Sequence, residues 1–226
     1  MKIRYASLSI VMGIITIIGL GFAGCGNAGS SDMTPTQTVE TFLDAFKAQD
    51  EEAMDQVYAG DGNDFMSAYE SRQSDDALTQ TIQDELMTKW YDFDYQVTGE
   101  TISEDGTTAT VDLKITTYDM KTVFNNFYQE YMGQALEQFS GNSNNVTTED
   151  YNRLAAEILK EEIDKATEKD YTGETSLNLT KTDGRWIVDK IGDENRDFQN
   201  TITGGFMDVL QDVVDTQGLD EDSEKQ

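Results

Sequence analysis

Hydrophobic residues first take up helical spacing a little after residue 34. The apolar positions that repeat at this spacing are Val39, Phe42, Leu43 and Phe46. Thr34, Pro35 and Gln37 precede them as an N-cap, a first-turn proline and a capping-box partner, so a helix is predicted to begin here. A second short helix is expected over Glu51–Tyr58, and the segment Phe65–Trp90 is expected to be mostly helical.

The pattern changes to a period of two after Trp90, which predicts a long, half-buried antiparallel hairpin. Its turn is expected near Glu104–Gly106, in SEDG. Asp92, Asp94 and Asp112 fall on the polar face of this hairpin. The predicted inward face consists of Tyr91, Phe93, Tyr95, Val97, Ala109, Val111, Leu113 and Ile115.

Three further helices and a second hairpin are predicted in the remaining part of the chain. Asp119 can cap a helix, and we interpret its apolar stripe as core: Phe124, Phe127, Tyr128, Tyr131, Ala135 and Leu136. After the polar loop SGNSNNVTTED, a helix is expected on Tyr151, Leu154, Ala155 and Ile158. Strands are expected at about 172–182 and 185–191, joined through TDG. A single last helix is expected on Phe198, Ile202, Phe206, Val209 and Val213.

This order of elements predicts an α+β fold. We expect an antiparallel sheet of two hairpins packed with N-terminal helices, a helical insertion between the hairpins and a C-terminal helix. Residues 34–215 are expected to form one domain, followed by an acidic disordered tail over residues 216–226.

The N-terminus carries the features of a lipoprotein export signal in the usual order. Lys2 and Arg4 precede an uncharged apolar run, Ile10–Ala23, which is shorter than the roughly 20 residues of a membrane-spanning helix. In LGFAGC, Gly24 and Cys25 follow this run, and the segment resembles the lipobox of bacterial lipoproteins. This resemblance implies cleavage between Gly24 and Cys25 and attachment of a lipid to the Cys25 sulfur. Residues 1–24 are then the signal peptide, and residues 25–33 are a flexible tether.

The composition of the chain excludes several classes of function. Without residues 1–24 the chain keeps 14 Lys and Arg against 44 Asp and Glu, a net charge of −30, which argues against binding to nucleic acid. There is no histidine, and Cys25 is the only cysteine, so imidazole-based triads, disulfides and zinc sites of Cys or His are excluded. No cofactor or metal site is predicted. The oxygen-rich turn at Asp61, Asn63 and Asp64 lacks the six or more ligands that calcium needs.

Three segments make the chain similar to a known group of proteins. They are TPTQTVETFLDAFKAQDEEAMDQVY, VDLKITTYDMKTVFNNF and TKTDGRWIVDKIG, in patches from residue 34 to about 192. With the lipobox, they resemble secreted lipoproteins, mostly of Gram-positive bacteria, that carry a nuclear-transport-factor-like (cystatin-like) domain of unknown function. The resemblance implies a cone-shaped fold held by lipid on the outer face of the cell membrane. The helical segment of about 121–167 is longer than in the simplest members.

Two functions are compatible with this resemblance, because the superfamily includes isomerases, dehydratases and non-enzymatic binding domains. The first is a non-catalytic module that binds an envelope protein or a small ligand. The second is an isomerase- or dehydratase-like enzyme that uses a carboxylate with a raised pKa in an apolar pocket. Tyr91, Tyr95, Trp186 and Asp189 are the candidate pocket residues, and Asp189 is the best candidate for a buried carboxylate. We favour the non-catalytic function, since the inward face of the first hairpin contains no acid.

Overall fold

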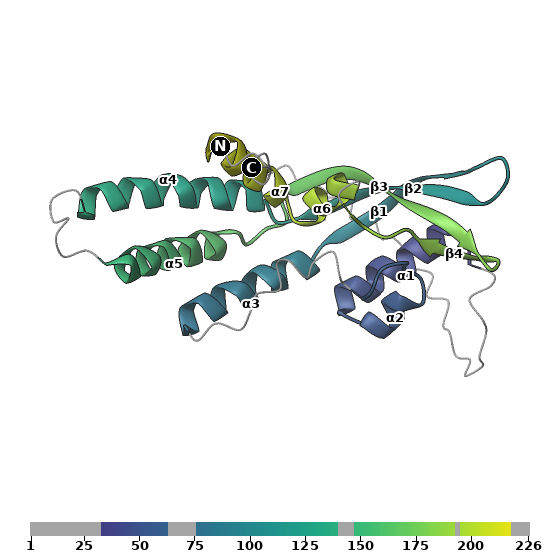
Figure 1. Ribbon diagram of the computed structural model, residues 1–226, viewed down its shortest axis with the longest axis horizontal. Helices are drawn as coiled ribbons and strands as arrows, with labels where there is room; N and C mark the ends of the chain where they lie inside the picture. Colours follow the sequence, from purple (N-terminus) through teal and green to yellow (C-terminus); the bar gives the residue numbers. More distant parts are fainter. Residues whose placement is uncertain (1–32, 63–75, 140–146, 193–194, 218–226) are drawn as a thin grey trace, which may run out of the picture.

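The protein has a mixed α+β fold. The computed structural model describes residues 33–62, 76–139, 147–192 and 195–217. Its helices are α1 (Pro35–Ala48), α2 (Glu51–Asp55), α3 (Ala77–Tyr91), α4 (Met120–Phe139), α5 (Thr148–Lys165), α6 (Arg196–Ile202) and α7 (Phe206–Gln217). Its strands are β1 (Asp94–Ile102), β2 (Thr108–Thr117), β3 (Tyr171–Thr182) and β4 (Arg185–Val188). The strands form one antiparallel sheet, as the sequence predicts, and their order is β1-β2-β3-β4 (Figure 1).

Helix α1 begins where the capping pattern places it. The Thr34 hydroxyl accepts a hydrogen bond from the Gln37 backbone N–H at 3.2 Å, and the Gln37 side chain accepts one from the Thr34 N–H at 3.0 Å. Gln49 ends the helix in the left-handed region, at φ 55°. The apolar face of α1 is buried against the sheet, with Phe42 and Phe46 fully inaccessible.

One face of the sheet holds the core, and the other face is polar. Along β2, Val111, Leu113 and Ile115 are fully buried, whereas the alternate positions Asp112 and Lys114 are exposed. Helix α1 contacts β1, β2 and β4, and α6 contacts β2 and β3. The alternation predicted for β2 is therefore confirmed.

A β-bulge changes the alternation in β1. The register shifts between Val97 and Gly99, so that Gly99 pairs with Asp112 on the polar face and Glu100 pairs with Val111 on the core face. Glu100 thereby reaches α1, where its carboxylate accepts hydrogen bonds from Thr36. Beyond α1 the hairpin continues outward, and Ile102 is 46% exposed.

The second hairpin turns through Asp183 and Gly184, both at positive φ (50° and 82°), as a two-residue loop of this kind requires. Strand β4 is shorter than predicted and ends at Val188. The chain after α2 pairs with this strand, because the Val188 N–H donates to the Val57 carbonyl at 2.8 Å.

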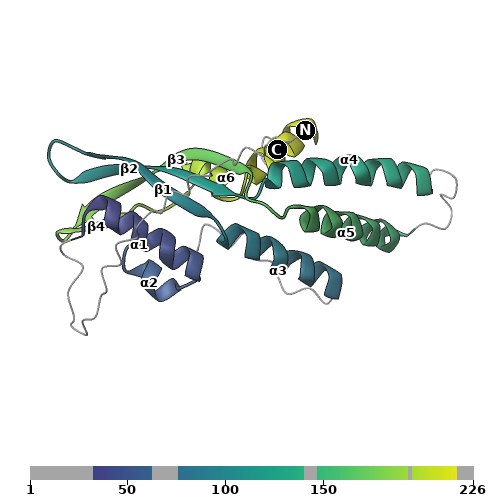
Figure 2. The same cartoon turned by 180° about the vertical axis from the view of Figure 1, so that it is seen from behind.

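Helices α3, α4 and α5 form an arm that extends away from the sheet (Figures 1 and 2). In this arm α5 contacts both α3 and α4. The prediction that Tyr91 lies on the first strand is wrong, since Tyr91 is the last residue of α3 and β1 begins at Asp94. Asp119 caps α4 as expected, accepting from the Thr122 N–H at 2.9 Å.

The apolar stripe of α4 is not core, contrary to the prediction. Phe124 is half-buried and packs against the core, but Tyr128 and Leu136 are exposed. The stripe extends along the arm past the end of the sheet, so none of the described strands covers it.

The single C-terminal helix predicted from the sequence is two helices. Gly204 and Gly205 separate α6 from α7, at φ values of 63° and 81°. A side chain at Gly204 would collide with the carbonyl oxygen of Tyr118, and the Gly204 carbonyl accepts a hydrogen bond from the Lys121 N–H at 2.9 Å. The break lets α7 turn onto α4.

Candidate functional site

Tyr91 and Tyr95 lie in the aromatic core beside α1. The Tyr91 ring packs against Phe46, with ring centroids 4.9 Å apart. The Tyr95 hydroxyl donates to the Asp44 carboxylate at 2.8 Å. Burial, followed by this hydrogen bond, raises the pKa of Tyr95 well above its usual value. Tyr95 therefore stays protonated at neutral pH.

Trp186 and Asp189 lie at the opposite edge of the sheet. Trp186 on β4 is 7% exposed and belongs to the core, with the Lys181 ammonium 5.1 Å from its ring centroid. Asp189 follows β4 and is half-buried, and its N–H donates to the Asn178 carbonyl at 2.8 Å. Because β2 and β3 separate these residues from Tyr95, the four candidates do not converge on one pocket.

The space between α1 and the sheet is filled by side chains. Phe42, Phe46 and Phe93 are fully buried there, with the Phe46 and Phe93 ring centroids 6.0 Å apart. The catalytic alternative needs a carboxylate facing an apolar cavity, whereas these aromatic rings fill the space between α1 and the sheet. Gly24, Cys25, Asn63 and Asp64 lie outside the described residues.

A polar cluster that sequence reasoning missed joins the arm to the sheet. Lys169, between α5 and β3, lies 2.7 Å from Asp92 and 3.2 Å from Asp94. The Tyr118 hydroxyl donates to Asp92 at 2.9 Å, and the Lys89 ammonium lies 4.3 Å from the Tyr118 ring centroid. The residues come from segments far apart in the chain, so only the polar character of Asp92 and Asp94 was visible in the sequence.

The charges in this cluster stabilise each other. The hydrogen bond from Lys169 is the main cause that lowers the pKa of Asp92. Burial alone would lower the pKa of Lys169, but its hydrogen bonds to Asp92 and Asp94 outweigh burial and raise it. The hydrogen bond to Asp92 also raises the pKa of Tyr118. A general acid or base works best with a pKa near the operating pH, and these shifts lead away from neutrality. The cluster is therefore suited to holding the arm against the sheet.

An acidic hollow of about 300 Å³ lies next to this cluster, between the start of α4 and the end of α5. Asp119, Glu162, Glu168 and Asp170 line it together with Lys165. Glu162 is buried, and its carboxylate accepts a hydrogen bond from Lys165 at 2.6 Å. Among the described residues, no group of three or more acidic, His or Cys side chains is arranged to hold a metal ion.

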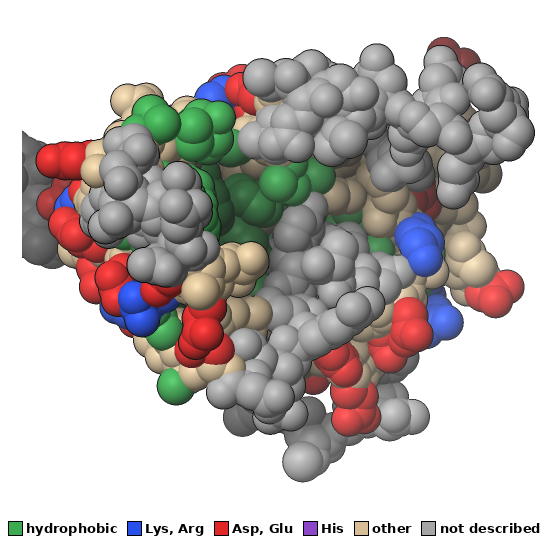
Figure 3. All heavy atoms as spheres, turned by 60° about the vertical axis from the view of Figure 1, so that its left-hand side comes forward, with side chains coloured by type: hydrophobic (Ala, Val, Ile, Leu, Met, Phe, Trp, Pro, Cys, Tyr) green, Lys and Arg blue, Asp and Glu red, His purple; other side chains and the backbone are tan. Residues whose placement is uncertain are grey.

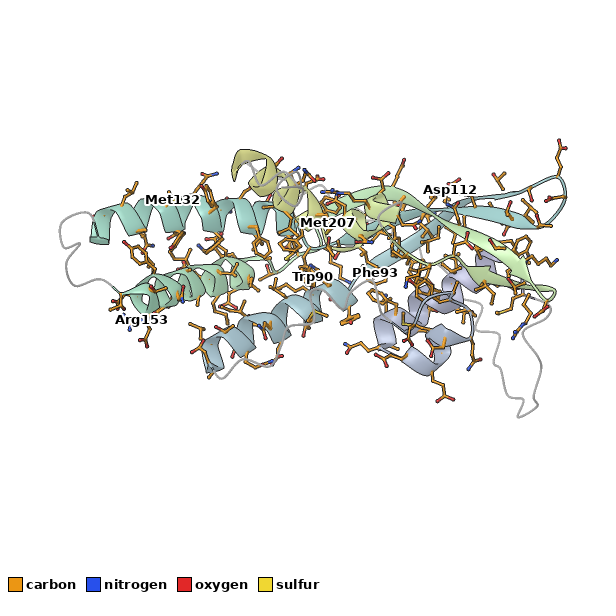
Figure 4. The ribbon with its side chains drawn as sticks, in the orientation of Figure 1. Trp90, Phe93, Asp112, Met132, Arg153 and Met207 are labelled. Carbon is orange, nitrogen blue, oxygen red and sulfur yellow. The ribbon has the colours of Figure 1, made fainter. Side chains whose placement is uncertain are left out.

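The arm also bears an apolar groove of about 240 Å³. We define it by Leu86, Met87, Trp90, Phe124, Leu159 and Phe206, which line it together with Gln83. Phe206 at the start of α7 links its two sides, with ring centroids 5.5 Å from Trp90 and 4.5 Å from Phe124. Trp90 and Met207 mark the place where the arm meets the sheet in Figure 4.

The groove is open to the surface. In Figure 3, hydrophobic side chains gather in a hollow, and acidic side chains lie farther out on the same face. The helical spacing of the α4 stripe correctly identified an apolar face. The spacing does not show whether another part of the fold covers that face, because this depends on how far the sheet extends.

No helix among the described residues is long and apolar enough to cross a membrane. No protein-family profile matches the sequence, and no curated protein matches it. A similar solved structure is the crystal structure of a provisionally assigned lipoprotein from Bacillus subtilis, with 13% identity and a TM-score of 0.46. The similarity covers 74% of this chain and 54% of that protein, so this chain spans about half its length. Similarity this low assigns neither a family nor a function.

Proposed function

We propose that the protein is a lipoprotein held by lipid on the outer face of the cell membrane of a Gram-positive bacterium, and that it acts there as a non-catalytic interaction module. The observation that carries the proposal is the N-terminal sequence. Positive charge at Lys2 and Arg4, an uncharged apolar run, the small pair Ala23-Gly24 and the single cysteine Cys25 follow each other as an export and lipidation signal requires.

The short sequence between Cys25 and the first helix supports this proposal. The first residue that the structure describes is Met33, and α1 is capped at Thr34. The intervening sequence GNAGSSD is small and polar, a composition typical of flexible linkers. A lipid on Cys25 would therefore hold the domain close to the bilayer without taking part in its core.

The interaction role is supported by the arrangement of the candidate residues. Tyr95 and Asp189 lie on opposite edges of the sheet, and the shifted pKa values of the polar cluster lead away from neutrality. The surface instead offers an open apolar groove on the arm. Surfaces of this kind in otherwise soluble domains often mark binding sites.

Fractionation of cells that produce Cys25→Ser tests the anchoring. Two acyl chains give stable membrane residence, so the unmodified protein should pellet with membranes. We expect Cys25→Ser to appear in the medium or to keep its signal peptide, and Ser30→Ala in the tether to behave like the unmodified protein. Normal processing together with full membrane retention of Cys25→Ser would disprove the lipid anchor.

A further inference from the structure

The apolar groove is too small and too open for a typical small-molecule site. Pockets for drug-sized ligands usually enclose about 300–1,000 Å³ and bury most of the ligand. The groove measures about 240 Å³ and lies between helices. Leu159 lines it from α5, the helix that contacts both α3 and α4. A space of this size suits one or two large side chains of a macromolecule.

Exposed hydrophobic side chains extend the groove along the two neighbouring helices. Tyr128 lies one turn after Phe124 on α4 and is 56% exposed. Leu210 lies one turn after Phe206 on α7 and is 39% exposed. Residues four apart share a helix face, so both extend the apolar helix faces from which Phe124 and Phe206 line the groove. Met132 follows Tyr128 by one more turn and is 41% exposed (Figure 4). The apolar surface is thus longer than the pocket itself and has the extent of several helical turns.

The charge around this surface determines what can cover it. The helices that border the groove, α3, α4, α5 and α7, carry 13 acidic and 5 basic side chains. All five basic side chains contact acceptors within the same molecule: Lys89 with the Ala166 carbonyl, Lys121 with Asp208, Arg153 with Asp150, Lys160 with Glu85 and Asp164, and Lys165 with Glu161 and Glu162. Asp84 and Glu157, each within two residues of a groove-lining residue, are exposed and make no ion pair in the described part of the chain. Negative charge is therefore left over around the groove.

A second copy of this chain does not complement such a surface. Without residues 1–24 each copy carries a formal net charge of −30, and pairing two arms would place like charges together. A cationic partner would instead gain attraction from the unpaired carboxylates while its apolar side chains fill the groove.

We infer that the groove binds an amphipathic helix of a partner protein, with hydrophobic residues on one face and lysine or arginine on the other. An α-helix presents anchors at positions i, i+3, i+4 and i+7, and helix-in-groove recognition uses such a row against an apolar furrow. This inference rests on the proposed interaction role and specifies the chemistry of the partner. It does not depend on the lipid anchor.

Binding of synthetic peptides to the full chain carrying Cys25→Ser tests the inference in solution. The probe is a labelled 18-residue helix with leucine on one face and lysine on the other. The comparison peptides replace every lysine with glutamate, or scramble the leucine and lysine positions so that no apolar face forms. Fluorescence anisotropy at about 0.15 M salt, where exposed charges are largely screened beyond about 8 Å, gives the dissociation constants. We expect at least tenfold weaker binding of both comparison peptides.

Single substitutions then locate the binding surface. Tyr128→Lys and Leu210→Lys each remove an exposed apolar side chain beside the groove and add a repelling charge, and each should weaken binding of the leucine–lysine helix at least fivefold. Ile102→Lys makes the same kind of change on the distant hairpin, at 46% exposure, and should alter binding less than twofold. All three side chains are exposed, and circular dichroism should show an unchanged fold.

Four outcomes would overturn the inference. The first is no binding of the leucine–lysine helix, and the second is equal binding of its scrambled form, which would indicate charge attraction alone. The third is unchanged binding by Tyr128→Lys and Leu210→Lys. The fourth is a dimer in sedimentation that these two substitutions dissociate, which would make a second copy the occupant. A failure of lipid anchoring would be seen only in the fractionation experiment, so the two proposals fail separately.

Discussion

The carboxylate of Glu100 on β1 holds the first turn of α1 through Thr36. It accepts hydrogen bonds from the Thr36 backbone N–H at 3.0 Å and from the Thr36 hydroxyl at 2.6 Å. Helix α1 has no acidic residue in its own first turn, so the strand supplies the negative charge that a helix N-terminus favours. The β-bulge after Val97 makes this possible, because it turns Glu100 toward the core face.

Replacing Glu100 with alanine should therefore destabilise the fold. The lost hydrogen bonds and charge at the helix end are together worth about 1 kcal/mol at an exposed site. Urea denaturation should show a lower midpoint with an unchanged slope. Glu104→Ala removes an exposed acid from the nearby turn and should have an effect of less than about 0.5 kcal/mol. Equal stability of the two variants would show that the contact with Thr36 contributes nothing.

Gly204→Ala should be much more destabilising. Gly204 has φ 63°, and a methyl group there would collide with the Tyr118 carbonyl oxygen, which belongs to the backbone and cannot rotate away. Conformational strain alone costs about 1–2 kcal/mol, and the collision adds to it. We expect a loss of more than about 3 kcal/mol in the free energy of unfolding, or no folded protein.

Gly184→Ala is the matched control for this prediction. Gly184 also has positive φ, at 82°, but a methyl group there would meet no atom within 4 Å. The loss of stability in Gly184→Ala should therefore reflect strain alone, about 1–2 kcal/mol. Thermal unfolding of both variants separates strain from collision, and equal losses would contradict the close approach of Gly204 to the Tyr118 carbonyl.

The ion pair between Asp92 and Lys169 should contribute a pH-dependent stability. The pKa of Asp92 is lowered from 3.8 in the folded protein, so its contribution is present above that pH and is lost as the pH falls through the folded value. Asp92 is half-exposed, which limits the effect to less than about 1 kcal/mol. Asp92→Asn should be less stable at pH 7, and the difference should shrink below about pH 4.

Asp112→Asn provides the comparison for the pH series. Asp112 is exposed on the polar face of the sheet and makes no ion pair in the described part of the chain. Urea denaturation between pH 3 and pH 7 should give this variant the same pH dependence as the unmodified protein. A constant difference between Asp92→Asn and the unmodified protein across that range would argue against the ion pair as its cause.

Local signals in the sequence predicted much of the fold. Thr34, Pro35 and Gln37 marked the start of α1, and the alternation around Leu113 identified the buried face of β2. TDG predicted the last hairpin turn, because Asp183 and Gly184 suit positive φ. Each of these signals depends on residues within one element, so it can be read without knowing the rest of the fold.

The errors arose where distant contacts decide the structure. Tyr91 continues the alternating pattern of Phe93 and Tyr95, but it packs against Phe46 from the end of a helix. The break at Gly204-Gly205 was missed, because the apolar spacing on both sides suggested one helix. The groove could not be predicted, because it depends on how three helices lie beside Phe206. The candidate pocket residues do not meet, because side chains fill the core between α1 and the sheet.

The position of the arm sets how far the protein would reach into its surroundings. Thr36 lies against Glu100 on the long hairpin, whereas the arm extends at the opposite end of the long axis (Figure 1). Helix α4 alone, with 20 residues, is about 30 Å long. In the anchored state that we propose, the lipid would hold the hairpin end near the bilayer, and the groove would stand off from it by the length of the sheet. A partner could then be met at a height above the lipid headgroups, without itself touching the membrane.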